Sequence, residues 1–106
     1  MNEKIEQLHE EAMFACDDAL IEKLKGNKES SFKKFNEAYE KEREAVDFLI
    51  QENYPEPTFS IMIKSAAILA LDCRKFQEAK ELANFALERN PTSLVKKELE
   101  DILEKY

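Results

Sequence analysis

One set of side chains stands at a spacing that could bind a soft metal ion. Met13 and Cys16 follow His9 by four and seven residues, which places all three on one face of an α-helix. An imidazole, a thioether and a thiolate are ligands that such ions use. Because His9 is the only histidine and no second cluster of sulfur or nitrogen lies near it in the sequence, we expect ordinary packing here and no cofactor. A small-ligand- or metal-binding helical bundle with a regulatory role remains the alternative hypothesis.

The other candidate groups do not form a catalytic pattern. Two pairs of adjacent carboxylates, Glu10 with Glu11 and Asp17 with Asp18, would point about 100° apart on a helix and could not hold one atom together. Gly26 is the only glycine, so no glycine-rich loop can surround a phosphate. The sequence therefore predicts a protein that is not an enzyme.

Composition and charge limit the classes of fold and partner. The 106 residues are 43 % hydrophobic and 37 % charged, and 16 basic against 23 acidic side chains leave a net charge of −7. Such a surface repels polyanions on average, so we expect no nucleic-acid partner. A group of four basic residues near the fourth predicted helix keeps nucleic acid as a further alternative, although a solvated helix face explains it better. These residues are Arg74, Lys75, Lys80 and Arg89.

Three features of the chain predict a cytoplasmic protein with no membrane association. The acidic segment 1–11 lacks the apolar core of a secretory signal. The longest apolar stretch, 59–71, is interrupted by polar residues and is too short to span a bilayer. Cys16 and Cys73 stand far apart without a CxxC motif, which favours reduced thiols over a disulfide framework.

Apolar residues recur every three or four positions along most of the chain, which predicts an all-α fold. The first helix covers 3–25 and ends at Gly26, where a left-handed residue is expected. Asn27 or Ser30 would cap a second helix, which ends near residue 53 because Pro55 and Pro57 follow.

The third predicted helix, 58–71, is apolar almost all round and should be covered on several sides. Its small residues Ala66, Ala67 and Ala70 would let a neighbouring helix approach closely. A fourth helix spans 76–87. Asn90 and Pro91 then predict the cap and first turn of a last helix, 91–106. Short connections make these five helices antiparallel neighbours.

A weak internal repeat links the second and fourth helices. Shifting the chain by 41 positions aligns Phe35, Glu37, Ala38, Ala45 and Val46 with Phe76, Glu78, Ala79, Ala86 and Leu87. Both segments would be the second helix of a helical hairpin, with their alanines set against the preceding helix.

At this point the sequence resembles the tetratricopeptide repeat family. An aromatic, a small residue, an Ala-Leu pair and a closing proline stand at the family's spacings. The first helix of the repeat matches only at Ala67, while Ala83 replaces an aromatic and Arg74 replaces a glycine. The matching residues are Phe76, Ala79, Ala86, Leu87 and Pro91.

The resemblance implies a single helical domain over 1–106 with an α-α superhelical architecture. Residues 58–91 would form one repeat-like hairpin of the family's length, preceded by an elongated divergent hairpin at 3–53. Residues 91–106 would form a capping helix.

The resemblance also implies a function, because in such folds the first helix of each hairpin lines a concave groove. The matching positions are Ile61, Lys64, Ile68 and Leu71. We expect them to bind another protein or peptide, or a second copy of the chain. Coverage of these positions by the chain's own first and last helices is left open. Lys64 matches a basic residue that binds terminal carboxylates in some relatives, but Ile68 replaces the asparagine which that clamp needs.

Overall fold

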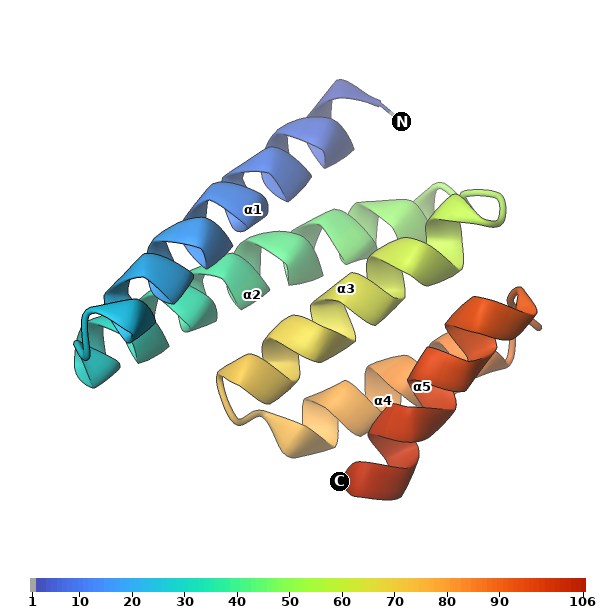
Figure 1. Ribbon diagram of the computed structural model, residues 1–106. Coiled ribbons are helices and arrows are strands. Elements are labelled where there is room, and N and C mark those ends of the chain that lie inside the picture. Colours follow the sequence, from blue (N-terminus) through green and yellow to red (C-terminus); the bar gives the residue numbers. More distant parts are fainter. Residues whose placement is uncertain (1) are drawn as a thin grey trace.

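Residues 2–106 are described by the computed structural model, and they form five α-helices joined by short turns (Figure 1). No strand occurs among these residues, so the predicted all-α class is confirmed. The helices are α1 (Glu3–Leu24), α2 (Lys28–Gln51), α3 (Thr58–Asp72), α4 (Phe76–Leu87) and α5 (Ser93–Lys105).

Each helix packs against the one before it, and α3 also contacts α5. Figure 1 shows that α1, α3 and α5 follow one another along one face of the molecule, while α2 and α4 form the other face. The molecule measures 39 × 34 × 20 Å. Its shortest dimension equals the thickness of two helices. The fold therefore consists of two layers of helices, and alternate helices along the chain lie in the same layer.

Left-handed residues end four of the helices. Gly26 has φ 84° after α1, as the sequence predicts, and Asn53 has φ 49° after α2. Arg74 and Asn90 have φ values of 61° and 52° after α3 and α4. In this conformation, the amides that follow the helix donate hydrogen bonds to carbonyls of its last turn. For example, the amide of Asn27 donates to the carbonyl of Glu22.

Asn27 stands at the cap position of α2, as predicted, but its predicted capping bond is absent, and the predicted start of the last helix is wrong. The side chain of Asn27 does not cap α2, because its Nδ2 donates instead to the Glu22 carboxylate at 2.7 Å. The last helix begins at Ser93 and not at Pro91. Asn90 cannot act as its cap, because the left-handed conformation of Asn90 completes the end of α4.

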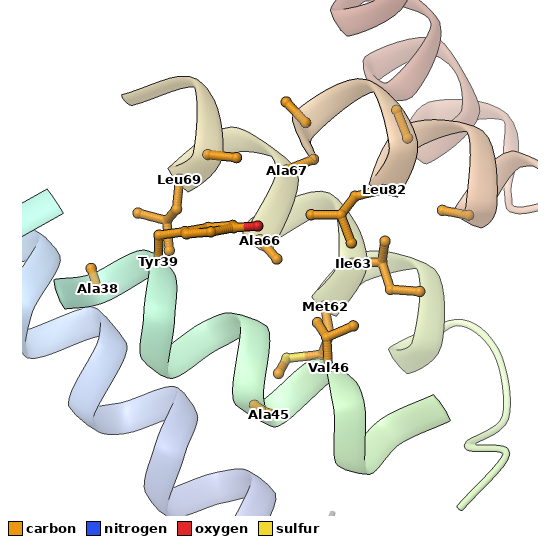
Figure 2. Packing of buried hydrophobic residues seen from close by; sticks show 14 of the residues in the cluster. Ala38, Tyr39, Ala45, Val46, Met62, Ile63, Ala66, Ala67, Leu69 and Leu82 are labelled. Atoms are coloured by element: carbon orange, nitrogen blue, oxygen red, sulfur yellow. The ribbon is translucent and has the colours of Figure 1, made fainter. Parts of the chain in front are cut away.

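The core is centred on α3. In Figure 2, Met62, Ala66 and Leu69 of α3 lie toward Tyr39 and Val46 of α2, while Leu82 of α4 lies beside Ile63. Small, fully buried residues on α3 let neighbouring helices approach it closely. They are Ala66, Ala67 and Ala70.

Helix α3 is covered on several sides, as predicted, because α2, α4 and α5 all pack against it. Ile61 and Ile68 are nevertheless 44 % and 40 % exposed. The two residues are seven apart and therefore share one stripe. This stripe is on the side of α3 that looks toward α1.

In the two segments of the internal repeat, the alanines are equally buried but the aromatic residues are not. Ala38, Ala45, Ala79 and Ala86 are all fully buried. Phe35 is buried as well, whereas its counterpart Phe76 is 43 % exposed and stacks on Tyr106 with ring centroids 5.4 Å apart. The aromatic position thus packs differently in the two hairpins.

Ala67→Trp should lower the free energy of unfolding by at least roughly 1–3 kcal/mol, because Ala67 is fully buried in the closely packed part of α3. Urea denaturation followed by circular dichroism measures this change. Lys41→Ala is the control, since Lys41 forms only a solvent-exposed pair with Glu11 at 3.7 Å and should cost less than about 0.5 kcal/mol. Equal midpoints for both variants would contradict the central position of α3.

Candidate binding groove

An open groove separates α1 from α3. Among residues 2–106, α1 packs against α2 alone and makes no contact with α3. The space between the two helices is a cavity of about 470 Å³. We call this space, with the residues that line it, the interhelical groove. Its lining comprises His9, Met13, Cys16, Thr58, Ile61, Met62, Lys64, Ser65, Ile68, Leu69 and Asp72.

The α1 wall arises from a second stripe on that helix. One stripe, which includes Leu8, Ala12 and Ala19, is buried against α2. His9, Met13 and Cys16 follow at helical spacing on the adjoining surface. They are partly exposed, because nothing in residues 2–106 covers this side of α1. The wall is therefore apolar or weakly polar and directed toward α3.

The α3 wall has a buried floor and an exposed rim. Met62 and Leu69 are 4 % and 3 % exposed and form the floor. Ile61 and Ile68 form the rim and remain accessible. An apolar surface of this kind, which is concave and flanked by helices, is the usual form of a site that takes up an apolar segment.

The structure brings together three of the four residues predicted for partner binding. Ile61, Lys64 and Ile68 line the interhelical groove. Leu71 does not, because it faces a smaller cleft of about 240 Å³ between α3 and α5. Lys64 also contacts α5, since its Nζ donates to the Glu98 carboxylate at 3.0 Å. The last helix therefore covers part of this face, whereas the first helix leaves the groove open.

A contact between a buried carboxylate and an imidazole lies behind the groove. Glu42 of α2 is fully buried, and both of its carboxylate oxygens lie within 3.0 Å of Nδ1 of His9. No other hydrogen-bond partner of this carboxylate occurs in residues 2–106. A carboxylate that is shielded from water needs a hydrogen-bond donor, because an unpaired buried charge is strongly unfavourable. Glu42 therefore fixes the ring of His9 at the wall of the groove.

Asp72 is at the opposite end of the groove from His9. Its carboxylate makes no hydrogen bond or ion pair with residues 2–106. Burial raises the pKa of this carboxyl above its ordinary value, and the positive charge of Lys23 opposes the effect. Burial, followed by the negative charge of Asp72, also raises the pKa of the Cys16 thiol. The field of Asp72 thus reaches across the groove to α1.

The alternative of a metal site receives no geometric support. His9, Met13 and Cys16 do line one groove, but residues 2–106 contain no group of three His, Cys, Asp or Glu side chains that could hold a metal ion. The raised pKa of Cys16 favours its thiol form, which is a poor ligand.

Two of the four basic residues near α4 have structural partners. Arg89 donates to Oδ1 of Asn53 and to the carbonyl of Tyr54, both at 3.1 Å. Its guanidinium also stacks on Phe59, 3.8 Å from the ring centroid. Lys75 lies 4.0 Å from the Glu78 carboxylate. These contacts bind the two side chains to the fold.

Acidic side chains border the groove on the outer side of α1. Glu6, Glu10 and Asp17 lie seven, three and four residues from Met13, so they occupy the neighbouring surface of the helix. All three are exposed, and none forms an ion pair within residues 2–106. We call these three residues the acidic rim.

The sequence contains a signal for the α1 wall. The spacing of His9, Met13 and Cys16 predicts that they share one helix face, and in the structure all three side chains line the open groove. Asp72 gave no such signal, because a single acid at the end of an apolar helix looks like ordinary termination. Glu42 gave none either, since it stands in a run of charged residues.

No helix in residues 2–106 combines the length and the apolar character needed to cross a membrane. No family model, curated protein or solved structure matches this chain. The groove therefore has to be interpreted from its own geometry and charge.

His9→Ala should lower the free energy of unfolding by on the order of 3 kcal/mol, because it leaves the Glu42 carboxylate buried without a donor. The double variant His9→Leu/Glu42→Leu replaces the pair by apolar groups and should recover most of this loss. Thermal and urea denaturation of the two variants measure the difference. A His9→Ala protein as stable as the wild type would show that Glu42 tolerates burial without this partner.

Asp72→Asn should raise the melting temperature at pH 7. Its ionised form is disfavoured in the folded state, as the raised pKa shows, and a negative charge is unfavourable at the C-terminal end of a helix. The increase in stability should be largest at pH values above the pKa of Asp72 in the folded state. It should vanish as the pH falls below about 3.9, where the Asp72 carboxyl is protonated in both the folded and the unfolded state. Asp18→Asn, which removes an exposed charge from the middle of α1, is the control and should give no comparable gain.

Proposed function

We propose that this protein is a protein-interaction module that binds an amphipathic helix of a partner protein in the interhelical groove. The partner helix carries lysine or arginine residues beside its apolar stripe. The observation that carries the proposal is the pair of exposed isoleucines, Ile61 and Ile68, which face an open apolar groove bordered by the acidic rim.

The dimensions of the groove suit a helix as the occupant. Its lining runs from Thr58 to Asp72, which is the whole length of α3. Fifteen residues of helix extend over roughly 21 Å, so a partner helix of about four turns would fill the groove. Anchors on such a helix recur at three, four and seven residues, and this spacing matches the seven-residue separation of Ile61 and Ile68.

Charge decides the chemistry of the partner. Helix α1, which forms one wall, contains seven acidic residues and two lysines. The acidic rim lies beside the apolar wall, where the polar flank of a bound helix would be. A basic flank would therefore be attracted and an acidic one repelled. The net charge of −7 acts in the same direction at long range.

The sequence resemblance supports this proposal, because the groove of tetratricopeptide-like folds binds peptides through the first helices of its hairpins. The positions implied by the resemblance include Ile61, Lys64 and Ile68, and these face the groove. We further propose a binding protein without enzymatic activity in a reducing compartment such as the cytoplasm. Its two cysteines, Cys16 and Cys73, are both free thiols.

Three synthetic 15-residue peptides test the proposal. The first is an amphipathic helix with leucine and lysine, the second replaces lysine with glutamate, and the third scrambles the first. Fluorescence anisotropy should show binding of the leucine-lysine helix, with an affinity at least about tenfold above that of the other two and falling with added salt. Methyl NMR signals of Met13, Ile61 and Ile68 should shift on binding.

Matched variants locate the binding surface. Ile68→Asn should weaken binding of the leucine-lysine helix about tenfold, because it removes a buried apolar contact from the complex. Ile50→Asn is the control, since Ile50 is exposed to a similar degree, 37 % against 40 %, but lies on the face formed by α2 and α4. Equal weakening by both variants, or a dimer that buries Ile61 and Ile68 in light scattering, would contradict the proposal.

A further inference from the structure

The interhelical groove has a direction, because its two walls run parallel. Each helix is antiparallel to the one before it, so α1 and α3 point the same way (Figure 1). The N-terminal halves of both helices border one end of the groove, near His9 and Thr58, and the C-terminal halves border the other end, near Asp72. The dipoles of the two walls therefore add, with the negative end of α3 at Asp72.

The N-terminal ends of α1 and α3 lie at the first end, beside His9. The Nδ1 atom of His9 is held by the buried carboxylate of Glu42 at 2.9 Å, and its Nε2 has no hydrogen-bond partner in residues 2–106. The ring is 31 % exposed and lines the groove. The positive ends of the two helix dipoles favour a partial negative charge on a bound segment here.

Asp72 provides acceptors at the second end. It is the last residue of α3, and its carboxylate, which lines the groove, has no hydrogen-bond donor among residues 2–106. The positive charge of Lys23 acts on this carboxylate, but no ion pair forms between the two side chains. A bound segment could therefore supply a donor to Asp72 at this end of the groove.

These two ends match the two ends of an α-helix in one direction only. The first turn of a helix has free N–H groups and a partial positive charge, and the last turn has free carbonyls and a partial negative charge. We infer that the partner helix lies antiparallel to α1 and α3, with its first turn at Asp72 and its last turn at His9. This inference rests on the proposed function and specifies the orientation of the occupant.

The inference also specifies where basic residues belong on the partner. A lysine or arginine in the first turn of a helix is ordinarily unfavourable, because it meets the positive end of the dipole. Next to the carboxylate of Asp72, that residue would gain a favourable charge contact that opposes this effect. The partner helix is thus expected to carry a basic residue in its first turn as well as along its flank.

Paramagnetic labels on the leucine-lysine peptide test the orientation. A nitroxide is attached in turn to the first and to the last residue of the 15-residue helix, and signals of the wild-type protein are recorded with each. The label on the first residue should broaden signals of Ile68 and Asp72, and the label on the last residue should broaden signals of Thr58 and Ile61. The reverse pattern, or equal broadening at both ends, would overturn the inference.

A second measurement separates this inference from the proposed function. Asp72→Asn, which removes no groove contact other than the charge, should weaken binding about fivefold, and a peptide without the first-turn lysine should lose this sensitivity. Asp18→Asn is the control and should change affinity less than about twofold. Failure of all peptides to bind would refute the proposed function, whereas tight binding that is insensitive to Asp72→Asn would refute only the orientation.

Discussion

The close contact of α3 with α2 and α4 is the constraint on which the rest of the structure depends. Ala66, Ala67 and Ala70 of α3 are fully buried, so neighbouring helices can approach α3 without bulky side chains between them. Helix α1 packs on α2 and not on α3. The groove follows directly from this arrangement, since an apolar stripe of α3 is left without a neighbour from its own chain.

The periodicity of apolar residues was sufficient to predict the five helices, because each helix buries one stripe and ends at a strong local signal such as Gly26. It did not predict which helices touch. The pair formed by His9 and Glu42 joins positions 33 residues apart, and no local pattern marks Glu42 as buried. Asn90 shows the same limit at shorter range, since asparagine can cap a helix start or adopt the left-handed turn that ends one.

For the candidate site, the sequence indicated the α3 wall and missed the identity of the α1 wall. Ile61, Lys64 and Ile68 could be predicted because one helix positions all three at fixed spacing. Leu71 is ten residues from Ile61 and is rotated away from the groove by the same helical geometry, toward α5. The groove is open because α1 packs on α2 and not on α3, and no local pattern in either wall encodes that arrangement.

The attachment of α1 to a single neighbour has a mechanical consequence. Helix α1 reaches the rest of the molecule through α2 alone, whereas α3 packs against α2, α4 and α5. The width of the groove is therefore determined by the single interface of α1 with α2, and the contact of His9 with Glu42 lies within that interface. Substitutions in this interface are expected to shift one wall of the groove, while the contacts of α3 with α4 and α5 involve other residues.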